Sequence, residues 1–184
     1  MHPRGALVDE LRAIGLKARL AEASRPERYV VGEGWGRRSG FLIEICGEPI
    51  RWVNIVSKSR GQQTQYTNIY VIPGPGILKE GWLKTVRVKT IPVFGRVVGL
   101  RWKGKMTVSL IRRLEQDVLL SQTLMRLKEN IEIRSDPEFG CWSLVSLQHK
   151  FDFRTARLWQ PAPSAEEWGC YKTIARHLLG HKGT

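Results

Sequence analysis

Between residues 29 and 102 the chain consists of short strand-like segments separated by turn residues, and this run constrains the fold more than any other feature. Segments rich in β-branched and aromatic residues, or with alternating character, occur at 29–31, 41–46, 50–57, 66–72, 82–91 and 93–102. Glycine, proline and polar residues separate them, as is typical of turns between strands. The pattern predicts a largely antiparallel sheet over about 28–103, extended by strands near 131–153.

Two segments on either side of this run have the apolar spacing of amphipathic helices. Residues 6–21 have apolar positions at i, i+4, i+7 and i+11, although Gly15 favours an early end. Residues 108–128 have an apolar stripe that is widened on both sides, which indicates burial on more than one face. We therefore expect 108–128 to form the most buried helix.

The last helix is predicted over 165–179 by signals at both of its ends. Ser164 and Glu167 have the spacing of a capping box, in which each side chain accepts a hydrogen bond from the backbone of the other. Gly180 suits the position after the helix, where a left-handed backbone is common. Together with the sheet, these three helices predict an α+β fold, a largely antiparallel sheet with flanking helices.

Length and composition predict one globular domain, and the apolar segments and cysteines indicate its compartment. The chain has 184 residues, of which 42% are hydrophobic and 26% charged. We expect a single domain over 1–184, and the turn at 73–76 marks where a division into two lobes would fall. No apolar stretch has the length of a secretory signal or a transmembrane segment. Three cysteines without close pairing, Cys46, Cys141 and Cys170, are typical of reduced thiols, so we expect a soluble cytoplasmic protein.

The positive charge is concentrated in the middle of the chain. Of the net charge of +13, residues 49–114 supply +12, because thirteen basic residues are offset by the single acid Glu80. Residues 1–48 contribute +1, and residues 115–184 contribute zero. Such one-sided charge is not needed for solubility, and it attracts anions. We therefore expect a polyanionic partner, provided that the strands bring these residues onto one surface.

Nucleic acid is the partner that this segment favours. Single-strand binders combine cations for the phosphates with aromatic rings for the bases. Six aromatic residues lie in the segment, although most are expected to pack in the core: Trp52, Tyr66, Tyr70, Trp82, Phe94 and Trp102. Alternation over 86–89 predicts Val86 and Val88 on one face, with Arg87 and Lys89 on the other, exposed face. The residues expected to bind nucleic acid are Arg87, Lys89, Arg96, Arg101, Lys103, Lys105, Lys84 and Trp102.

Two other kinds of partner would use the same charge. A structural or assembly subunit would bind an acidic protein, and a peripheral membrane protein would bind an anionic lipid surface. The basic residues lie on predicted strands rather than on an amphipathic helix, which weighs against the membrane. For nucleic acid we expect little sequence preference, since the chain contains no recognition motif.

The sequence contains no convincing catalytic or metal-binding set, and it predicts no cofactor. Asp136 and Glu138 could hold a metal for phosphodiester cleavage, but Asp-Pro is common in turns and the rest of a nuclease pattern is missing. His177 and His181 share a helical face but lack a third ligand. The glycines at 32–40 precede a strand, which indicates a hairpin rather than a dinucleotide-binding loop. We therefore expect a binding protein rather than an enzyme, with a metal-dependent nuclease as the less favoured alternative.

Overall fold

The computed structural model describes residues 5–21, 37–60, 63–74, 77, 79–91, 95–148, 150–152 and 157–180. In this part of the chain the elements follow in the order α1 (Ala6–Ala13), β1 (Lys17–Leu20), β2 (Arg37–Cys46), β3 (Trp52–Arg60), β4 (Gln63–Pro73), β5 (Gly81–Lys89), β6 (Val97–Lys105), α2 (Val108–Gln116), α3 (Val118–Arg126), β7 (Ile131–Asp136), β8 (Cys141–Ser146), β9 (Lys150–Asp152), β10 (Arg157–Trp159) and α4 (Ala165–Leu178). The predicted α+β class is confirmed.

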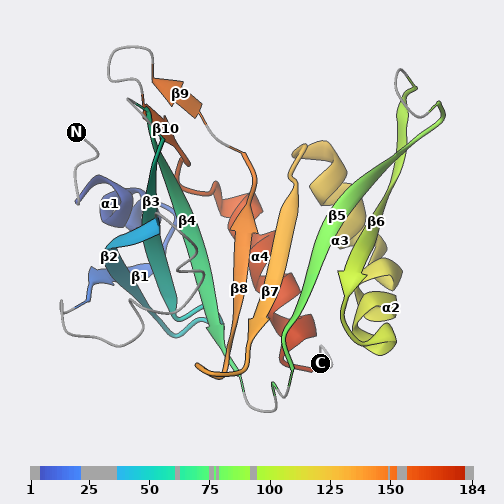
Figure 1. Cartoon of the computed structure of the whole chain (residues 1–184), viewed down its shortest axis with the longest axis horizontal. Helices are drawn as coiled ribbons and strands as arrows, with labels where there is room; N and C mark the ends of the chain where they lie inside the picture. Colours follow the sequence, from blue (N-terminus) through green and yellow to red (C-terminus); the bar gives the residue numbers. More distant parts are fainter. Residues whose placement is uncertain are drawn as a thin grey trace.

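Eight of the strands form one open sheet (Figure 1). Their order is β1-β2-β3-β4-β8-β7-β5-β6, and every neighbouring pair is antiparallel. The short strand β10 pairs parallel with the beginning of β4, and β9 pairs with β10. The expectation of a largely antiparallel sheet is therefore confirmed, with the β4–β10 pair as the exception among the described strands.

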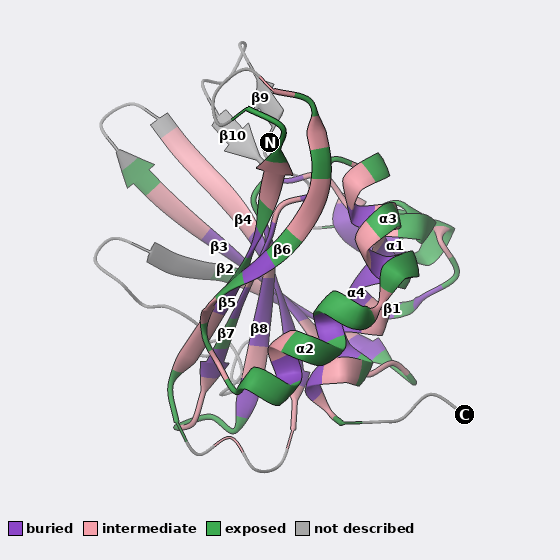
Figure 2. Cartoon of the chain, turned by 90° about the vertical axis from the view of Figure 1, so that its right-hand side faces the viewer, coloured by how far each residue is buried: buried purple, intermediate pink, exposed green. Residues whose placement is uncertain are grey.

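The described helices lie on one face of the sheet, which we call the inner face (Figure 2). Tyr70 of β4 is central to the packing between this face and α4, because its ring centroid lies 6.0 Å from that of Trp168 and 4.9 Å from that of Tyr171. Successive side chains of a strand point to opposite faces, so the neighbours of Tyr70 along β4 lie on the other, outer face. A small apolar cluster there consists of Val56, Ile69, Val71 and Cys141.

The first helix ends earlier than the prediction over 6–21. α1 stops at Ala13, Gly15 has a left-handed backbone with φ of 88°, and β1 then pairs with β2. Glycine adopts this conformation without the steric cost that a side chain adds. Leu16 and Ala18 are buried although they lie outside the helix, which explains why the apolar spacing extends beyond it.

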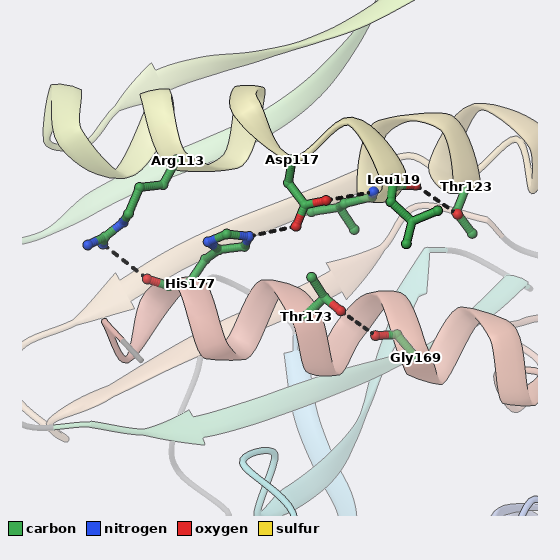
Figure 3. A network of polar contacts seen from close by, with 8 residues as sticks. Arg113, Asp117, Leu119, Thr123, Gly169, Thr173 and His177 are labelled. Atoms are coloured by element: carbon green, nitrogen blue, oxygen red, sulfur yellow. Dashed lines mark hydrogen bonds and ion pairs between the residues drawn. The ribbon is translucent and has the colours of Figure 1, made fainter. Parts of the chain in front are cut away.

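The predicted helix over 108–128 is two helices that meet at Asp117 (Figure 3). The Asp117 backbone is not helical, and its Oδ1 accepts a hydrogen bond from Leu120 N at 2.9 Å, which caps α3. Asp117 Oδ2 lies 2.8 Å from Nε2 of His177, and Arg113 donates to the His177 carbonyl at 3.1 Å. These bonds join both helices to α4. The expectation that this segment is the most buried is wrong, because α2 and α3 each bury two residues whereas α4 buries six.

The two predicted end signals of α4 are confirmed. Ser164 Oγ accepts a hydrogen bond from Glu167 N at 3.2 Å, and Glu167 Oε2 accepts one from Ser164 N at 2.6 Å. Gly180 has a left-handed backbone with φ of 73° just after the helix. Among the described helices, none combines the length and the apolar character needed to cross a membrane.

Candidate functional site

The hairpin of β5 and β6 carries a large part of the positive charge. Residues 81–114, which include this hairpin and most of α2, contain nine basic residues and no acidic residue. The hairpin stands at the opposite end of the sheet order from β1, and it extends away from the neighbouring strands (Figure 1). The orientation of its side chains therefore decides whether the charge forms a surface.

Burial along β5 shows which side chains face outward. Leu83 is 0% exposed and Thr85 is buried, so both point to the inner face. The residues that alternate with them, Trp82, Lys84 and Val86, therefore lie on the outer face. Of these three, Lys84 and Val86 are exposed and Trp82 is half-buried.

The register between β5 and β6 adds three cations to the same face. Residues directly opposite each other in an antiparallel pair share a face. The outward pairs are Trp82 with Lys105, Lys84 with Lys103, and Val86 with Arg101. We give the name basic face to the four exposed cations that this arrangement brings together on the outer face: Lys84, Arg101, Lys103 and Lys105.

The side chains of β5 point to the opposite faces from those predicted. Val86 is 37% exposed, whereas Arg87 points to the inner face, where its Nε and one terminal nitrogen are buried without a hydrogen-bond partner. The prediction that Arg87 lies on an exposed cationic face is therefore wrong. The pairing with β7 places Leu83 opposite Ile133 in the core, and Thr85 is compatible with the same face because its Oγ1 accepts a hydrogen bond from Ile131 N at 2.8 Å.

The remaining predicted binding residues lie elsewhere on the hairpin. Lys89 and Arg96 are exposed near its tip. Trp102 is 5% exposed and lies on the inner face, so it is not available to stack on a base, contrary to the expectation for this residue. Of the other aromatic residues, Tyr70 is buried, Trp52, Tyr66 and Trp82 are half-buried, and Phe94 lies outside the described residues.

Glu132, the acid that stands opposite Lys84 on β7, is paired with Arg134 rather than with the basic face. Lys84 and Lys103 stand directly opposite each other, an arrangement in which like charges repel. On the other side of Lys84, Glu132 of β7 accepts a hydrogen bond from Arg134 Nε at 2.6 Å. None of the four cations forms an ion pair within the described part of the chain. A bound anion would relieve the repulsion.

A pocket of about 980 Å³ opens on the outer face and includes two residues of the basic face. Trp82 and Lys84 of β5 and Lys105 of β6 line one side. Glu132, Arg134 and Asp136 of β7 line the other. The Lys84 ammonium lies 5.6 Å from the centroid of the Trp82 ring, at a distance typical of a cation–π contact. We call this hollow the Trp82 pocket.

Two glycines allow β5 and β6 to approach closely beside the pocket. A Cβ on Gly104 would lie 2.0 Å from the Trp82 carbonyl oxygen, and a Cβ on Gly81 would lie 2.5 Å from the Lys105 carbonyl oxygen. Neither position has room for a side chain, so both strands need glycine there. The two glycines therefore set the relative position of Trp82 and Lys105.

A carboxyl group that the sequence analysis did not single out is buried inside the protein. Glu129, just after α3, is 2% exposed and accepts a hydrogen bond from Ser146 Oγ at 2.7 Å. Burial, aided by a hydrogen bond with the Glu167 carboxyl, raises the pKa of Glu129 to about 7, while the Ser146 bond and the charge of Arg87 act in the opposite direction. Glu129 is buried and Glu167 is half-buried, and we call the two the carboxyl pair. Its one sequence signal was the capping box, which places Glu167 in the first turn of α4.

The residues considered for metal binding have structural partners. Asp136 Oδ1 accepts a hydrogen bond from Phe139 N at 3.3 Å, within the turn that joins β7 to β8. His177 bonds to Asp117, and His181 lies outside the described residues. Within the described ranges, no three His, Cys, Asp or Glu side chains are grouped so that they could hold a metal ion.

Comparison of the chain with protein-family models, with curated proteins and with solved structures found no match in any of the three.

Proposed function

We propose that the protein binds nucleic acid through the basic face, with little sequence preference. The observation that supports this most is the row of four exposed cations on adjacent strands, which have no ion-pair partner among the described residues. Along β6 the cations are two residues apart, or about 7 Å. Successive phosphates of an extended nucleic-acid strand have a similar spacing, so a backbone can follow the row.

Contacts of this kind give affinity without reading the sequence. Lysine and arginine neutralise phosphates, and each neutralised phosphate releases counterions, which makes binding sensitive to salt. Four contacts correspond to a slope of log affinity against log salt of about −3 for a single strand and about −4 for a duplex. The salt slope is therefore proportional to the number of phosphates that the protein neutralises.

Charge reversal at Arg101 and Lys103 tests the proposal. Both side chains are exposed on the outer face of β6, so Arg101→Glu combined with Lys103→Glu should leave the fold intact. We expect at least about tenfold weaker binding at about 0.1 M salt, and a slope reduced to about half, because two of four contacts are lost. Fluorescence anisotropy with labelled oligonucleotides over a salt series measures both quantities.

A matched control changes the net charge equally at a distance from the basic face. Lys17 on β1 and Arg176 on α4 are both exposed, and their combined reversal to glutamate adds the same negative charge. If this control weakens binding as much as the β6 variant, total charge rather than the basic face is responsible. Absence of wild-type binding to every oligonucleotide at low salt would refute the proposal.

An acidic protein is a second candidate, which the position of β6 favours. β6 ends the sheet order, so one edge of its backbone has no strand partner in the described part of the chain. Such an edge can accept an added strand, and an acidic segment would place carboxylates beside Arg101 and Lys103. Titration with an acidic peptide and with anionic liposomes, next to the oligonucleotides, separates this partner and a membrane surface from nucleic acid.

A further inference from the structure

The Trp82 pocket has one cationic side and one acidic side. On the β6 side, Lys105 continues into the basic face. On the β7 side and in the turn that follows, Asp136 and Glu138 supply carboxylates, while Glu132 is paired with Arg134, which also lines the pocket. Trp82 lies on β5, the strand between the two. A ligand that fits this arrangement is aromatic, with an anionic end and an edge that donates hydrogen bonds.

A nucleotide unit has all three properties. We propose that the Trp82 pocket holds one unpaired base of a nucleic acid whose phosphates lie on the basic face, and that bases with an exocyclic amino group are preferred. This inference rests on the proposed function. The pocket volume of about 980 Å³ is sufficient for one nucleotide.

Stacking on Trp82 supplies the preference for an unpaired base. The indole is half-buried, and the Lys84 ammonium 5.6 Å from its centroid shows that a polar group reaches this ring from the outer face. Lys84 is exposed on a flexible stem, so a base can take its place while the ammonium turns to the adjoining phosphate. A duplex would have to unstack a base to enter the pocket, which costs free energy, whereas a single strand does not.

Asp136 supplies the preference for an amino group. Its Oδ1 accepts the hydrogen bond of the turn from Phe139 N, which leaves the second oxygen as an acceptor beside the pocket. Glu132 is already bonded to Arg134. Cytosine carries an N4 amino donor where uracil carries an O4 acceptor, and a carboxylate accepts from the first and repels the second. Oligocytidine should therefore bind more tightly than oligouridine.

The first experiment compares two tryptophans on the same face of the sheet. Trp52 of β3 is also half-buried on the outer face, but it lies four strands from Trp82, or about 19 Å. Trp82→Leu should weaken the binding of a short single strand about tenfold and the binding of a hairpin duplex less than about twofold. Trp52→Leu should change neither, and thermal melting shows whether both variants are folded.

The second experiment changes the acceptor without removing the tryptophan. Asp136→Asn keeps an oxygen for the Phe139 N–H and replaces the second acceptor with an amide donor. Wild type should bind oligocytidine about fivefold more tightly than oligouridine at slightly alkaline pH, where cytosine is neutral, and Asp136→Asn should abolish or reverse this difference.

The outcomes separate this inference from the proposed function. If the wild type shows no salt-dependent binding to any oligonucleotide, the basic face is not a nucleic-acid site and both proposals fail. If it binds and the two homopolymers bind equally well to the wild type, the preference for an amino group is wrong. If it binds but Trp82→Leu equals Trp52→Leu, the pocket does not hold a base. The basic face then remains as a site for phosphates alone.

Discussion

Glu129→Gln should remove a pH dependence of stability that arises from the buried Glu129 carboxyl of the carboxyl pair. Burial is the main cause that raises the pKa of Glu129 to about 7. The folded protein therefore keeps this proton over a range of pH in which the unfolded chain has lost it. Because the folded state binds more protons in that range, this contribution to stability is fully present below the unfolded pKa and is lost as the pH rises through about 7.

The size of the effect follows from the two pKa values. A rise in the pKa of Glu129 from 4.5 to about 7 corresponds to about 3 kcal/mol of stability. Of this free energy, about 2 to 3 kcal/mol is lost between about pH 5 and about pH 8. Glutamine imitates the protonated carboxyl, since it can accept from Ser146 and donate to Glu167. The free energy of unfolding of the wild type should therefore fall by this amount relative to that of Glu129→Gln.

Urea titrations of both proteins at a series of pH values measure the difference. Other carboxyls also titrate, so the relevant quantity is the wild-type value minus the variant value at each pH. Glu132→Gln is the control, because it also removes one negative charge, but from a partly exposed carboxyl on β7, the strand that follows Glu129. Parallel profiles for wild type and Glu129→Gln would show that Glu129 has an ordinary pKa in the folded protein, and the reasoning would be wrong.

Two further predictions concern the backbone. Gly104→Ala should destabilise the protein by more than about 2 kcal/mol, because its Cβ would lie 2.0 Å from the Trp82 carbonyl oxygen, while Gly99→Ala on the same strand, where the nearest atom is 3.9 Å away, should have little effect. Equal melting temperatures for the two variants would contradict the close approach of β5 and β6. Ser164→Ala should cost about 1 kcal/mol in urea unfolding through loss of the capping box, and an unchanged midpoint would show that the cap is dispensable.

Elements with strong local end signals could be predicted from the sequence. Ser164, Glu167 and Gly180 act within a few residues of each other, so α4 follows from its own segment. The break at Asp117 was missed although its signal is also local. Aspartate is a favoured cap, but the apolar stripe continues across the break because α2 and α3 bury residues against the same core.

Strand order and the burial of Glu129 depend on contacts between distant segments. β4 pairs with β8 through Tyr70 and Leu144, and β5 pairs with β7 through Leu83 and Ile133. Nothing in either local sequence selects these partners over other strands. Glu129 becomes buried only when these pairings and the packing of α4 are in place, so its raised pKa has no local sequence signal.

The basic face could be predicted only in part, because alternation divides a strand into two sets without saying which set is buried. In β5 one set contains Leu83 and Arg87, and the other contains Lys84 and Val86, so each set mixes an apolar with a charged residue. The pairing with β7 decides between them, since it places Leu83 opposite Ile133 in the core. Arg87 is then carried to the inner face, where its charge opposes the rise in the pKa of Glu129. The two cations of β5 therefore lie on opposite faces: Lys84 is exposed on the outer face, and Arg87 lies on the inner face near Glu129.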